Sequence, residues 1–364
     1  MKSLLARAYG KRKVLVTGHT GFKGSWLAFW LSRLGAKVTG YSLEPPTRPN
    51  HFELLELDCA SVLADLRDQT RLRETIEAQR PEIVFHLAAQ AIVRKSYSDP
   101  AETFSSNVTG LVNLLEACRK SESVTALVVV TSDKCYDNRG LRRGYREQDA
   151  MGGYDPYSAS KGCAEIIASS YRRSFFPPEA YGRSHRLLLA SARAGNVLGG
   201  GDWGQDRLVP DVVKAAATGD RALIRYPRSI RPWQHVLDPL SGYLLLGARL
   251  LEGHAQLAGA WNFGPSATGA VSVAKILKML SKGWDKIDWR FDEGGHPHEA
   301  AVLRLDCEKA RSQLGWRPVW DIGKTIWATA AWYRGFYEEQ KILTAGQIEE
   351  YQKDAEAAEV GGRR

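Results

Sequence analysis

Short runs of apolar and β-branched residues alternate with longer helix-like segments through the first half of the chain. The runs are short and rich in β-branched residues, so each predicts a strand, and the run "ALVVV" predicts a strand buried on both faces of a sheet. We expect strands at residues 13–18, 36–42, 61–66, 82–89, 126–132 and 187–195. Strands that alternate with helices form a parallel sheet covered on both sides, which predicts the doubly wound α/β (Rossmann) fold class.

The composition changes near residue 195, beyond which glycine, proline and tryptophan are denser and apolar runs are more isolated. This change predicts a Rossmann domain at residues 1–195 and a smaller, mixed α/β domain at residues 196–345, with some segments interleaved. Residues 346–364 are mostly polar and end in glycine and arginine, which predicts a frayed tail.

Composition also limits the kinds of partner. The net charge is +9, but the basic residues are spread along the chain, so we expect an anionic small molecule and no nucleic acid. No window of about 18 apolar residues occurs, so we expect no membrane span. The five cysteines are far apart and form no C-x-x-C pair, which predicts reduced thiols in the cytoplasm and no zinc site.

A glycine-rich segment, "VTGHTGFKGSW", follows the first predicted strand and opens a helix, with Gly18, Gly21 and Gly24 spaced G-x-x-G-x-x-G. Glycine allows a tight turn and a close approach of the backbone to a pyrophosphate, which the helix N-terminus then binds. The segment therefore predicts a dinucleotide site. Glu44 has the spacing of an acid that selects NAD, but Ser42 stands at the strand end where that acid is expected. NAD is favoured over NADP.

The segment "YDPYSASKGCAE" opens another predicted helix and places Tyr157 and Lys161 four residues apart, on one face. A free tyrosine has a pKa of about 10 and is a poor base, but a nearby ammonium stabilises its phenolate. The phenolate can take a proton from a sugar hydroxyl while hydride leaves the attached carbon. The pair therefore predicts hydride-transfer chemistry.

The segment "TSDKCYDN" places Asp133 beside Lys134 directly after the apolar run "ALVVV", at the C-terminal end of a predicted strand. An exposed, salt-bridged loop would explain the pair without any function. The glycine loop before it and the Tyr-x-x-x-Lys pair after it favour an acid and a base beside the cofactor.

These motifs, together with "FHLAAQ", "NVTG", "RAGNVLGGGDW" and "IRPWQHVLD", resemble the extended short-chain dehydrogenase/reductases, the group of nucleotide-sugar epimerases and dehydratases. The resemblance runs from about Lys13 to beyond Trp316. Within this group, "GHTGFKGSW", "SDKCYDN", "GGYDPYSASKG", "SIRPWQHVL" and "HPHEA" are similar to the CDP-glucose 4,6-dehydratases.

The resemblance implies an NAD-dependent hydro-lyase that turns CDP-glucose into its 4-keto-6-deoxy form. Tyr157, with Lys161, would deprotonate the 4-hydroxyl, and Ser132 would hydrogen-bond the 4-oxygen. Asp133 would protonate the departing 6-hydroxyl. Lys134 stands where the related dehydratases carry a glutamate base, so it is either the base at C5 or a cation that stabilises the enolate. The expected cofactor contacts are Gly18, Gly21, Phe22, Lys23, Gly24, Asp65, Leu66, Ala88, Ala89, Gln90, Asn107, Tyr157 and Lys161.

For the nucleotide-sugar half, the resemblance implies diphosphate contacts from Asn196 and Arg231. Weaker candidates for the substrate site are Arg193, Asp206, Arg207, Gln234 and Glu299, and Asp65 is either an adenine contact or a strand-end cap. His296, His298 and Glu299 lack helical metal-ligand spacing, so we expect no metal. A 4-epimerase or dehydratase of another nucleotide sugar, and a noncatalytic binding protein, are the alternatives. The resemblance also implies a homodimer or a dimer of dimers.

Overall fold

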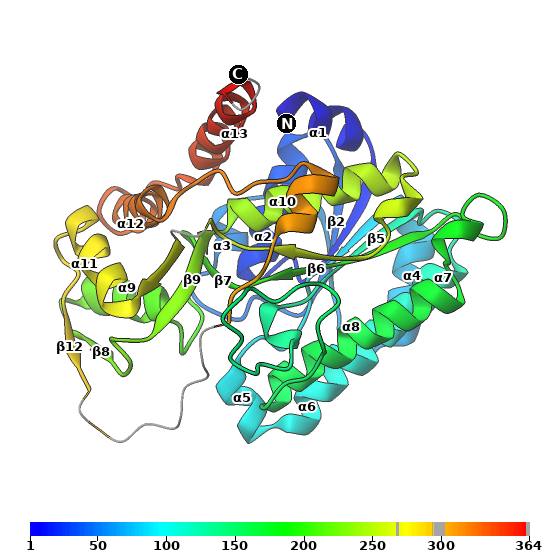
Figure 1. Cartoon of the computed structure of the whole chain (residues 1–364). Coiled ribbons are helices and arrows are strands. Elements are labelled where there is room, and N and C mark those ends of the chain that lie inside the picture. The colour runs from blue at the N-terminus through cyan, green and yellow to red at the C-terminus, as the bar shows by residue number, and fades with distance from the viewer. Residues whose placement is uncertain (267–268, 293, 295–302, 362–364) are drawn as a thin grey trace.

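The computed structural model describes residues 1–266, 269–292, 294 and 303–361. A seven-stranded sheet lies at its centre (Figure 1), with strands β1 (Lys13–Thr17), β2 (Lys37–Ser42), β3 (Ala60–Leu63), β4 (Ile83–His86), β5 (Ala126–Val130), β6 (Leu188–Ala194) and β10 (Ala260–Phe263). The order is β10-β6-β5-β4-β1-β2-β3, and all neighbouring strands are parallel. The predicted doubly wound fold class is confirmed.

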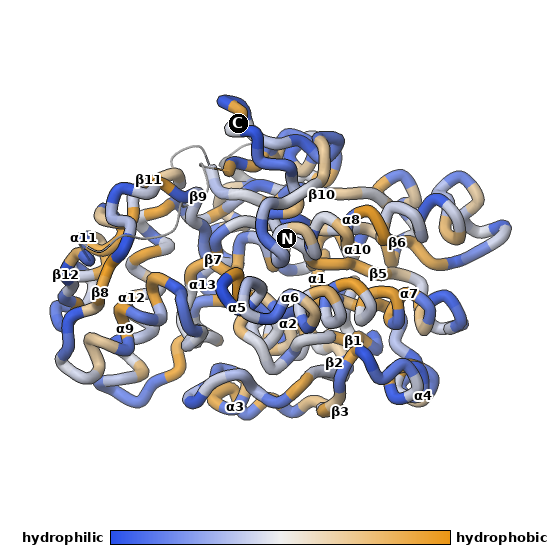
Figure 2. The backbone as a smooth tube through the Cα atoms, turned by 90° about the horizontal axis from the view of Figure 1, so that it is seen from below, coloured by the Kyte–Doolittle hydropathy of each residue, from blue (hydrophilic) through white to orange (hydrophobic). Residues whose placement is uncertain are grey.

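Helices cover both faces of this sheet. One face packs against α2 (Phe22–Arg33) and α10 (Leu237–Leu251), and the other against α4 (Gln69–Gln79), α7 (Gly110–Lys120) and α8 (Pro156–Ser174). Along β5, Val128 and Val130 belong to the first core, whereas Leu127 and Val129 belong to the second. Strand β5 is apolar throughout because its successive side chains enter opposite cores, and Figure 2 shows an apolar centre of the sheet.

Shorter helices and turns connect these elements. They are α1 (Lys2–Tyr9), α3 (His51–Leu54), α5 (Val93–Ser98), α6 (Pro100–Phe104), the π-helical turn η1 (Ser105–Thr109), and the 3-10 turns η2 (Asp133–Cys135) and η3 (Pro178–Ala180). Helix α8 begins where Asp155 caps the backbone N–H of Ser158 at 2.9 Å and Pro156 takes the first helical position. This start places Tyr157 and Lys161 in the first turns of the helix, beside the strand ends.

Most of the chain beyond residue 195 builds a smaller lobe. A three-stranded sheet contains β7 (Asn196–Leu198), β9 (Ile230–His235) and β11 (Ala270–Ser272), and a two-stranded sheet contains β8 (Ala222–Ile224) and β12 (Trp289–Phe291). The remaining helices and turns are α9 (Leu208–Thr218), η4 (Ala255–Leu257), α11 (Val273–Gly283), η6 (Ala310–Leu314) and α12 (Ile322–Glu339). Helix α10 and strand β10 return from this half of the chain to the large sheet.

The chain closes with an ordered helix, α13 (Thr344–Gly361), so the prediction of a frayed tail at 346–364 is wrong up to residue 361. Ile348, Tyr351 and Ala355 recur at helical spacing and are buried. The Tyr351 hydroxyl donates to Asp238 at 2.8 Å. Figure 1 shows α13 beside α1, near the N-terminus. A short apolar stripe within a polar sequence is enough to dock the helix.

Candidate active site

The glycine loop lies between β1 and α2 at the C-terminal edge of the large sheet. Gly18 has φ +75°, and a Cβ there would lie 2.7 Å from the backbone nitrogen of Ala88. A Cβ on Gly24 would overlap the Gly18 carbonyl oxygen. Helix α2 begins after Gly21 without a side-chain cap, so its first N–H groups remain available to an anion. A tight glycine cradle against an uncapped helix N-terminus fits a dinucleotide pyrophosphate.

Polar side chains follow β2 and β3 on the adenosine side of this cradle. The hydroxyls of Thr20 and Ser42 lie 2.8 Å apart, which ties the glycine loop to the end of β2. Glu44 lines a hollow of about 260 Å³ together with Pro45, Thr47, Arg48, Asn50 and Glu53. The Asp65 carboxylate accepts the backbone N–H of Arg67 at 2.8 Å and pairs with its guanidinium. Asp65 therefore caps the turn after β3, and its contact with adenine stays a prediction.

The loop after β4 is joined to the start of α8 by amide and hydroxyl groups. Asn107, in the π-helical turn, accepts the Gln90 backbone N–H at 2.8 Å and donates to the Ser160 hydroxyl at 2.8 Å. Ser160 in turn donates to the Tyr157 carbonyl at 2.7 Å. Ala88 and Ala89 lie between β4 and this network. The predicted cofactor contacts Gln90 and Asn107 therefore also hold the helix that carries Tyr157.

Tyr157 and Lys161 lie together in α8, with the Lys161 ammonium 6.0 Å from the Tyr157 ring centre. Burial, with a smaller contribution from the Asp133 charge, raises the pKa of Tyr157 to about 12. A hydrogen bond with Ser132 and the positive charge of Arg207 act in the opposite direction. Burial lowers the pKa of Lys161 to about 8, against the carboxylate of Glu165. The phenol thus depends on nearby cations to act as a base.

The turn η2 places Asp133 and Lys134 directly after β5. Asp133 is buried, and its carboxylate accepts the Ser132 hydroxyl at 2.9 Å. A Cβ on Gly195 would lie 2.9 Å from Asp133 Oδ2, so this carboxylate packs against the end of β6. Burial raises the pKa of Asp133, while Lys134, Ser132 and Lys23 oppose the shift. In the described part of the chain no ion pair joins Asp133 to Lys134, which argues against a simple salt-bridged loop.

Two further cations lie near the reacting groups. Burial lowers the pKa of Lys23 to about 8, while the charge of Asp133 raises it and those of Arg207 and Lys161 lower it. Arg207 bonds the Asp202 carboxylate at 2.8 Å. The sequence motif assigned Lys23 to the cofactor and gave no role to Asp202, because a loop partner five residues away carries no periodic signal.

The predicted substrate residues divide into two groups. Asn196 begins β7, Arg231 lies on β9 and Arg207 precedes α9, so all three stand at or near the end of a strand or helix. Asp206 has φ +56° and binds Arg94 at 2.9 Å and Arg225 at 3.4 Å, which joins the two lobes. Glu299, like His296 and His298, lies outside the described residues.

Arg193 and Gln234 are buried and bonded within the protein, and their assignment to the substrate stays a prediction. Arg193 is buried, and its guanidinium binds Glu165 at 2.7 Å and the Tyr136 hydroxyl at 2.6 Å. Gln234 is buried on β9 and donates to the Phe263 carbonyl at 3.1 Å. Alternation along each strand turns both side chains into the interior. Glu165, one helical turn beyond Lys161, was missed because its partner comes from a distant strand.

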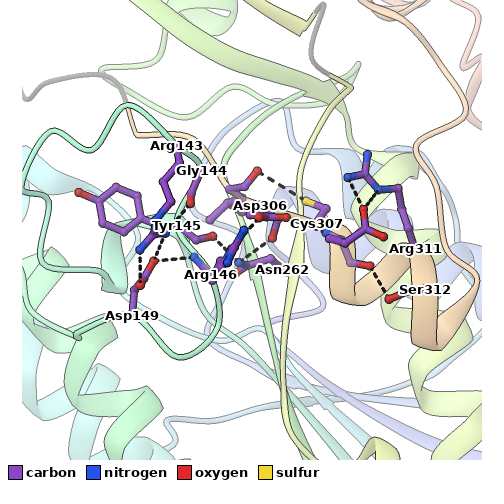
Figure 3. A network of polar contacts seen from close by, with 12 residues as sticks. Arg143, Gly144, Tyr145, Arg146, Asp149, Asn262, Asp306, Cys307, Arg311 and Ser312 are labelled. Atoms are coloured by element: carbon purple, nitrogen blue, oxygen red, sulfur yellow. Dashed lines mark hydrogen bonds and ion pairs between the residues drawn. The ribbon is translucent and has the colours of Figure 1, made fainter.

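A polar network holds the loop between η2 and α8 against β10 and Asp306 (Figure 3). Arg143 binds Asp149 at 2.6 Å, and Arg146 binds Asp306 at 2.9 Å. Asn262, on β10, donates to the carbonyls of Tyr145 at 2.8 Å and of Asp306 at 3.1 Å. The loop that follows the catalytic turn is thereby fixed to the end of β10.

Among the described residues, no helix is long and apolar enough to cross a membrane. The five cysteines all carry free thiols.

The comparisons agree with the motifs. Residues 15–329 match the family described as GDP-mannose 4,6 dehydratase. The chain is 50% identical to "CDP-glucose 4,6-dehydratase" of Salmonella typhimurium, covering 94% of this chain and 96% of that protein. It is 29% identical to "dTDP-glucose 4,6-dehydratase" of Streptomyces antibioticus, covering 92% and 96%.

A solved structure, that of UDP-glucose 4-epimerase from Brucella ovis in complex with NAD, matches with a TM-score of 0.72 and 26% identity. The match covers 88% of this chain and 97% of that one. The resemblance to nucleotide-sugar epimerases and dehydratases is thus confirmed along most of the chain. The chain belongs to the GDP-mannose 4,6 dehydratase family, within the extended short-chain dehydrogenase/reductases.

Proposed function

We propose that this enzyme dehydrates CDP-glucose to CDP-4-keto-6-deoxyglucose and that NAD is its cofactor. The observation that carries the proposal is the convergence of Ser132, Asp133, Lys134, Tyr157 and Lys161 at one edge of the sheet, beside the glycine cradle. The 50% identity to the Salmonella CDP-glucose 4,6-dehydratase supports the choice of substrate. An epimerase needs the Tyr157 and Lys161 pair but no additional acid and base, so Asp133 and Lys134 favour dehydration.

The reaction begins with proton transfer from the sugar. Tyr157 takes the proton of the 4-hydroxyl, Ser132 hydrogen-bonds the 4-oxygen, and Lys161 and Arg207 stabilise the phenolate. Bound NAD supplies the hydride acceptor for C4 and later the hydride donor for C6. The N-terminus of α2 and the backbone of Gly18, Gly21, Phe22, Lys23 and Gly24 would hold its pyrophosphate.

Elimination follows because a 4-keto group makes the C5 proton acidic. Lys134 removes that proton, and Asp133 gives its own proton to the 6-hydroxyl, which leaves as water. Burial, the largest cause, raises the pKa of Asp133 and so favours the protonated carboxyl that this step needs. Asn196, Arg207 and Arg231 would bind the substrate diphosphate.

The test compares CDP-glucose with UDP-, GDP- and dTDP-glucose under identical conditions. The 4-keto-6-deoxy product absorbs in alkali, and we expect it from CDP-glucose. Turnover of dTDP-glucose alone would overturn the cytidine assignment. Loss of water from none of the four sugars would overturn the dehydratase assignment.

We also propose a homodimer or a dimer of dimers in the cytoplasm. Phe104 on α6, and Ile166 on α8 with Phe175 just beyond it, expose 37%, 59% and 45% of their surface, which gives neighbouring helices an apolar face for a second copy. The free thiols suit a reducing compartment. Light scattering of the purified enzyme tests the oligomer: a monomeric mass at micromolar concentration would contradict it.

A further inference from the structure

Arg193 and Glu165 form an ion pair inside the large domain. Arg193 Nη2 lies 2.7 Å from Glu165 Oε2, and the two side chains expose only 4% and 3% of their surface. Glu165 also accepts the hydroxyls of Thr131 at 2.5 Å and Ser191 at 2.7 Å. Burial raises the pKa of Glu165, but Arg193 and these hydroxyls bring it below its usual range. The carboxylate is therefore ionised and fully bonded.

The pair joins the three elements that carry the candidate catalytic groups. Thr131 directly precedes the turn of Ser132, Asp133 and Lys134 at the end of β5. Glu165 lies four residues beyond Lys161 in α8, on the face that also carries Tyr157. Arg193 lies on β6, just before Asn196. The ion pair thus lies in the interior, bonded or adjacent in sequence to the elements that carry the candidate catalytic groups.

Arg193 also holds the other end of the catalytic turn. Its Nη1 donates to the Tyr136 hydroxyl at 2.6 Å, and its guanidinium lies 4.9 Å from the centre of that ring. Tyr136 donates to Asn262 Oδ1 at 2.7 Å, which connects the turn to the network of Figure 3. Thr131 and Tyr136 bracket residues 132–135, so the pair fixes both ends of the turn that carries the acid and the base.

The pair also sets the charge next to Tyr157. Burial lowers the pKa of Lys161 to about 8, and the Glu165 carboxylate raises it. The other titratable groups around Lys161 are Cys135 on η2, His86 on β4, Lys23 on α2 and Tyr157 on α8. Burial keeps His86 neutral, with its pKa lowered to about 3. Glu165, on the same helix α8 as Lys161, is thus the carboxylate that favours the charged form of Lys161.

We propose that Glu165 and Arg193 are positioning residues for the reaction: together they hold the Ser132–Lys134 turn against Tyr157 and keep Lys161 cationic. This inference rests on the proposed function. If the ion pair were purely structural, removing both of its charges would leave kcat unchanged. A buried pair replaced by apolar groups of similar size often leaves stability unchanged or improved.

The test is the double variant Glu165→Gln/Arg193→Met, which removes both charges and leaves no unpaired ion in the core. Its matched control is Arg249→Met/Glu252→Gln, which removes an ion pair of 2.7 Å that is exposed at the end of α10. Both variants and the wild type are assayed for melting temperature, substrate affinity and the pH dependence of kcat. The substrate is whichever nucleotide sugar the wild type turns over, so failure with CDP-glucose alone overturns only the substrate assignment.

We expect the core double variant to fold and bind substrate, with kcat reduced by about 10²-fold because the turn is displaced. Loss of the Glu165 charge lowers the pKa of Lys161, so the alkaline limb of the kcat profile moves to lower pH. The control pair should behave as the wild type. A folded core variant with an unchanged kcat and pH profile would overturn the proposal.

If the double variant does not fold, two milder variants test whether the ion pair positions the Ser132–Lys134 turn. Thr131→Val removes one bond between Glu165 and the turn. Tyr136→Phe removes the bond from Arg193 and the bond to Asn262, and the ion pair remains in both variants. Each should lower kcat by about tenfold or more with substrate affinity retained, since the turn loses one of its two anchors. Wild-type kcat in both variants would overturn the positioning role.

Discussion

Asp238 lies in the first turn of α10 with none of its surface exposed. Its Oδ1 accepts the backbone N–H of Val319 at 2.7 Å and the hydroxyl of Tyr351 at 2.8 Å, which docks α13. Within the described residues its Oδ2 has no hydrogen-bond partner. Burial raises the pKa of Asp238 to about 7, against these donors. The folded protein therefore holds this carboxyl in its protonated form below about pH 7.

This shift makes stability depend on pH in a direction that can be calculated. The folded pKa lies above the unfolded one, so the native state binds the proton more tightly and its advantage is lost as pH rises from about 4 to about 7. At about 1.36 kcal/mol per pH unit, the whole window is worth about 4 kcal/mol, of which about 2.5 kcal/mol falls between pH 5 and pH 8. The first-turn amides of α10 favour the charged form by about 0.3–1 kcal/mol and reduce this drop without removing it.

Asp238→Asn keeps an oxygen for Val319 and Tyr351 and cannot ionise. We therefore expect the variant to gain stability over the wild type by about 3 °C in Tm between pH 5 and pH 8. Scanning calorimetry over this range measures the difference, and Asp58→Asn, at an exposed aspartate, is the matched control. A constant gap between wild type and Asp238→Asn across the range would refute the assignment of a buried, protonated carboxyl.

The remaining predictions concern the active site. Lys134→Met should abolish deuterium exchange at C5 in heavy water while C4 oxidation survives, as mass spectrometry of the sugar would show; unchanged exchange would remove Lys134 from the role of base. Asp133→Asn cannot protonate the leaving hydroxyl, so dehydration should fall by about 10²–10⁴-fold and reduced nicotinamide should accumulate in a rapid-mixing assay. Wild-type turnover would exclude Asp133 as the acid. Gly24→Ala puts a Cβ on the Gly18 carbonyl and should abolish NAD binding in calorimetry. Gly21→Ala, whose Cβ would meet the same oxygen at 3.3 Å, should lose far less; equal losses would contradict the cradle.

The fold was predictable where local pattern and tertiary packing agree. The strands predicted at 82–89, 126–132 and 187–195 correspond to β4, β5 and β6, which are buried throughout, because a doubly buried strand needs a continuous apolar run. Strand β10, "AWNF", carries no such run and becomes a strand by pairing with β6, with Ala260 opposite Ser191. Helix α13 has a polar composition, and its order comes from Tyr351 and its partner Asp238, more than a hundred residues earlier. Neither partner is visible in the local sequence.

In the site, too, residues whose role depends on local spacing were predictable, and residues placed by a distant partner were not. Spacing within one helix or loop predicted Tyr157, Lys161 and the glycine cradle, because those residues act through their own backbone. Arg193 and Arg231 are both arginines on strands beside the site, and composition does not separate them. The Arg193 side chain points inward, where it pairs with Glu165 on helix α8. That pairing depends on the packing of α8 against β6.

Asp133 links the two halves of the proposed reaction. Its charged form raises the pKa of Tyr157, whereas its neutral form does not, so a protonated Asp133 makes the phenol a better base for the first step. The same proton is then available for the 6-hydroxyl in the second step. One consequence distinguishes this coupling from a simple acid: Asp133→Asn is permanently neutral, so the acidic limb of C4 oxidation should move to lower pH. Measuring the rate of single-turnover hydride transfer across pH tests this coupling. If the acidic limb of the profile stays in place or moves to higher pH, Asp133 does not couple the two steps.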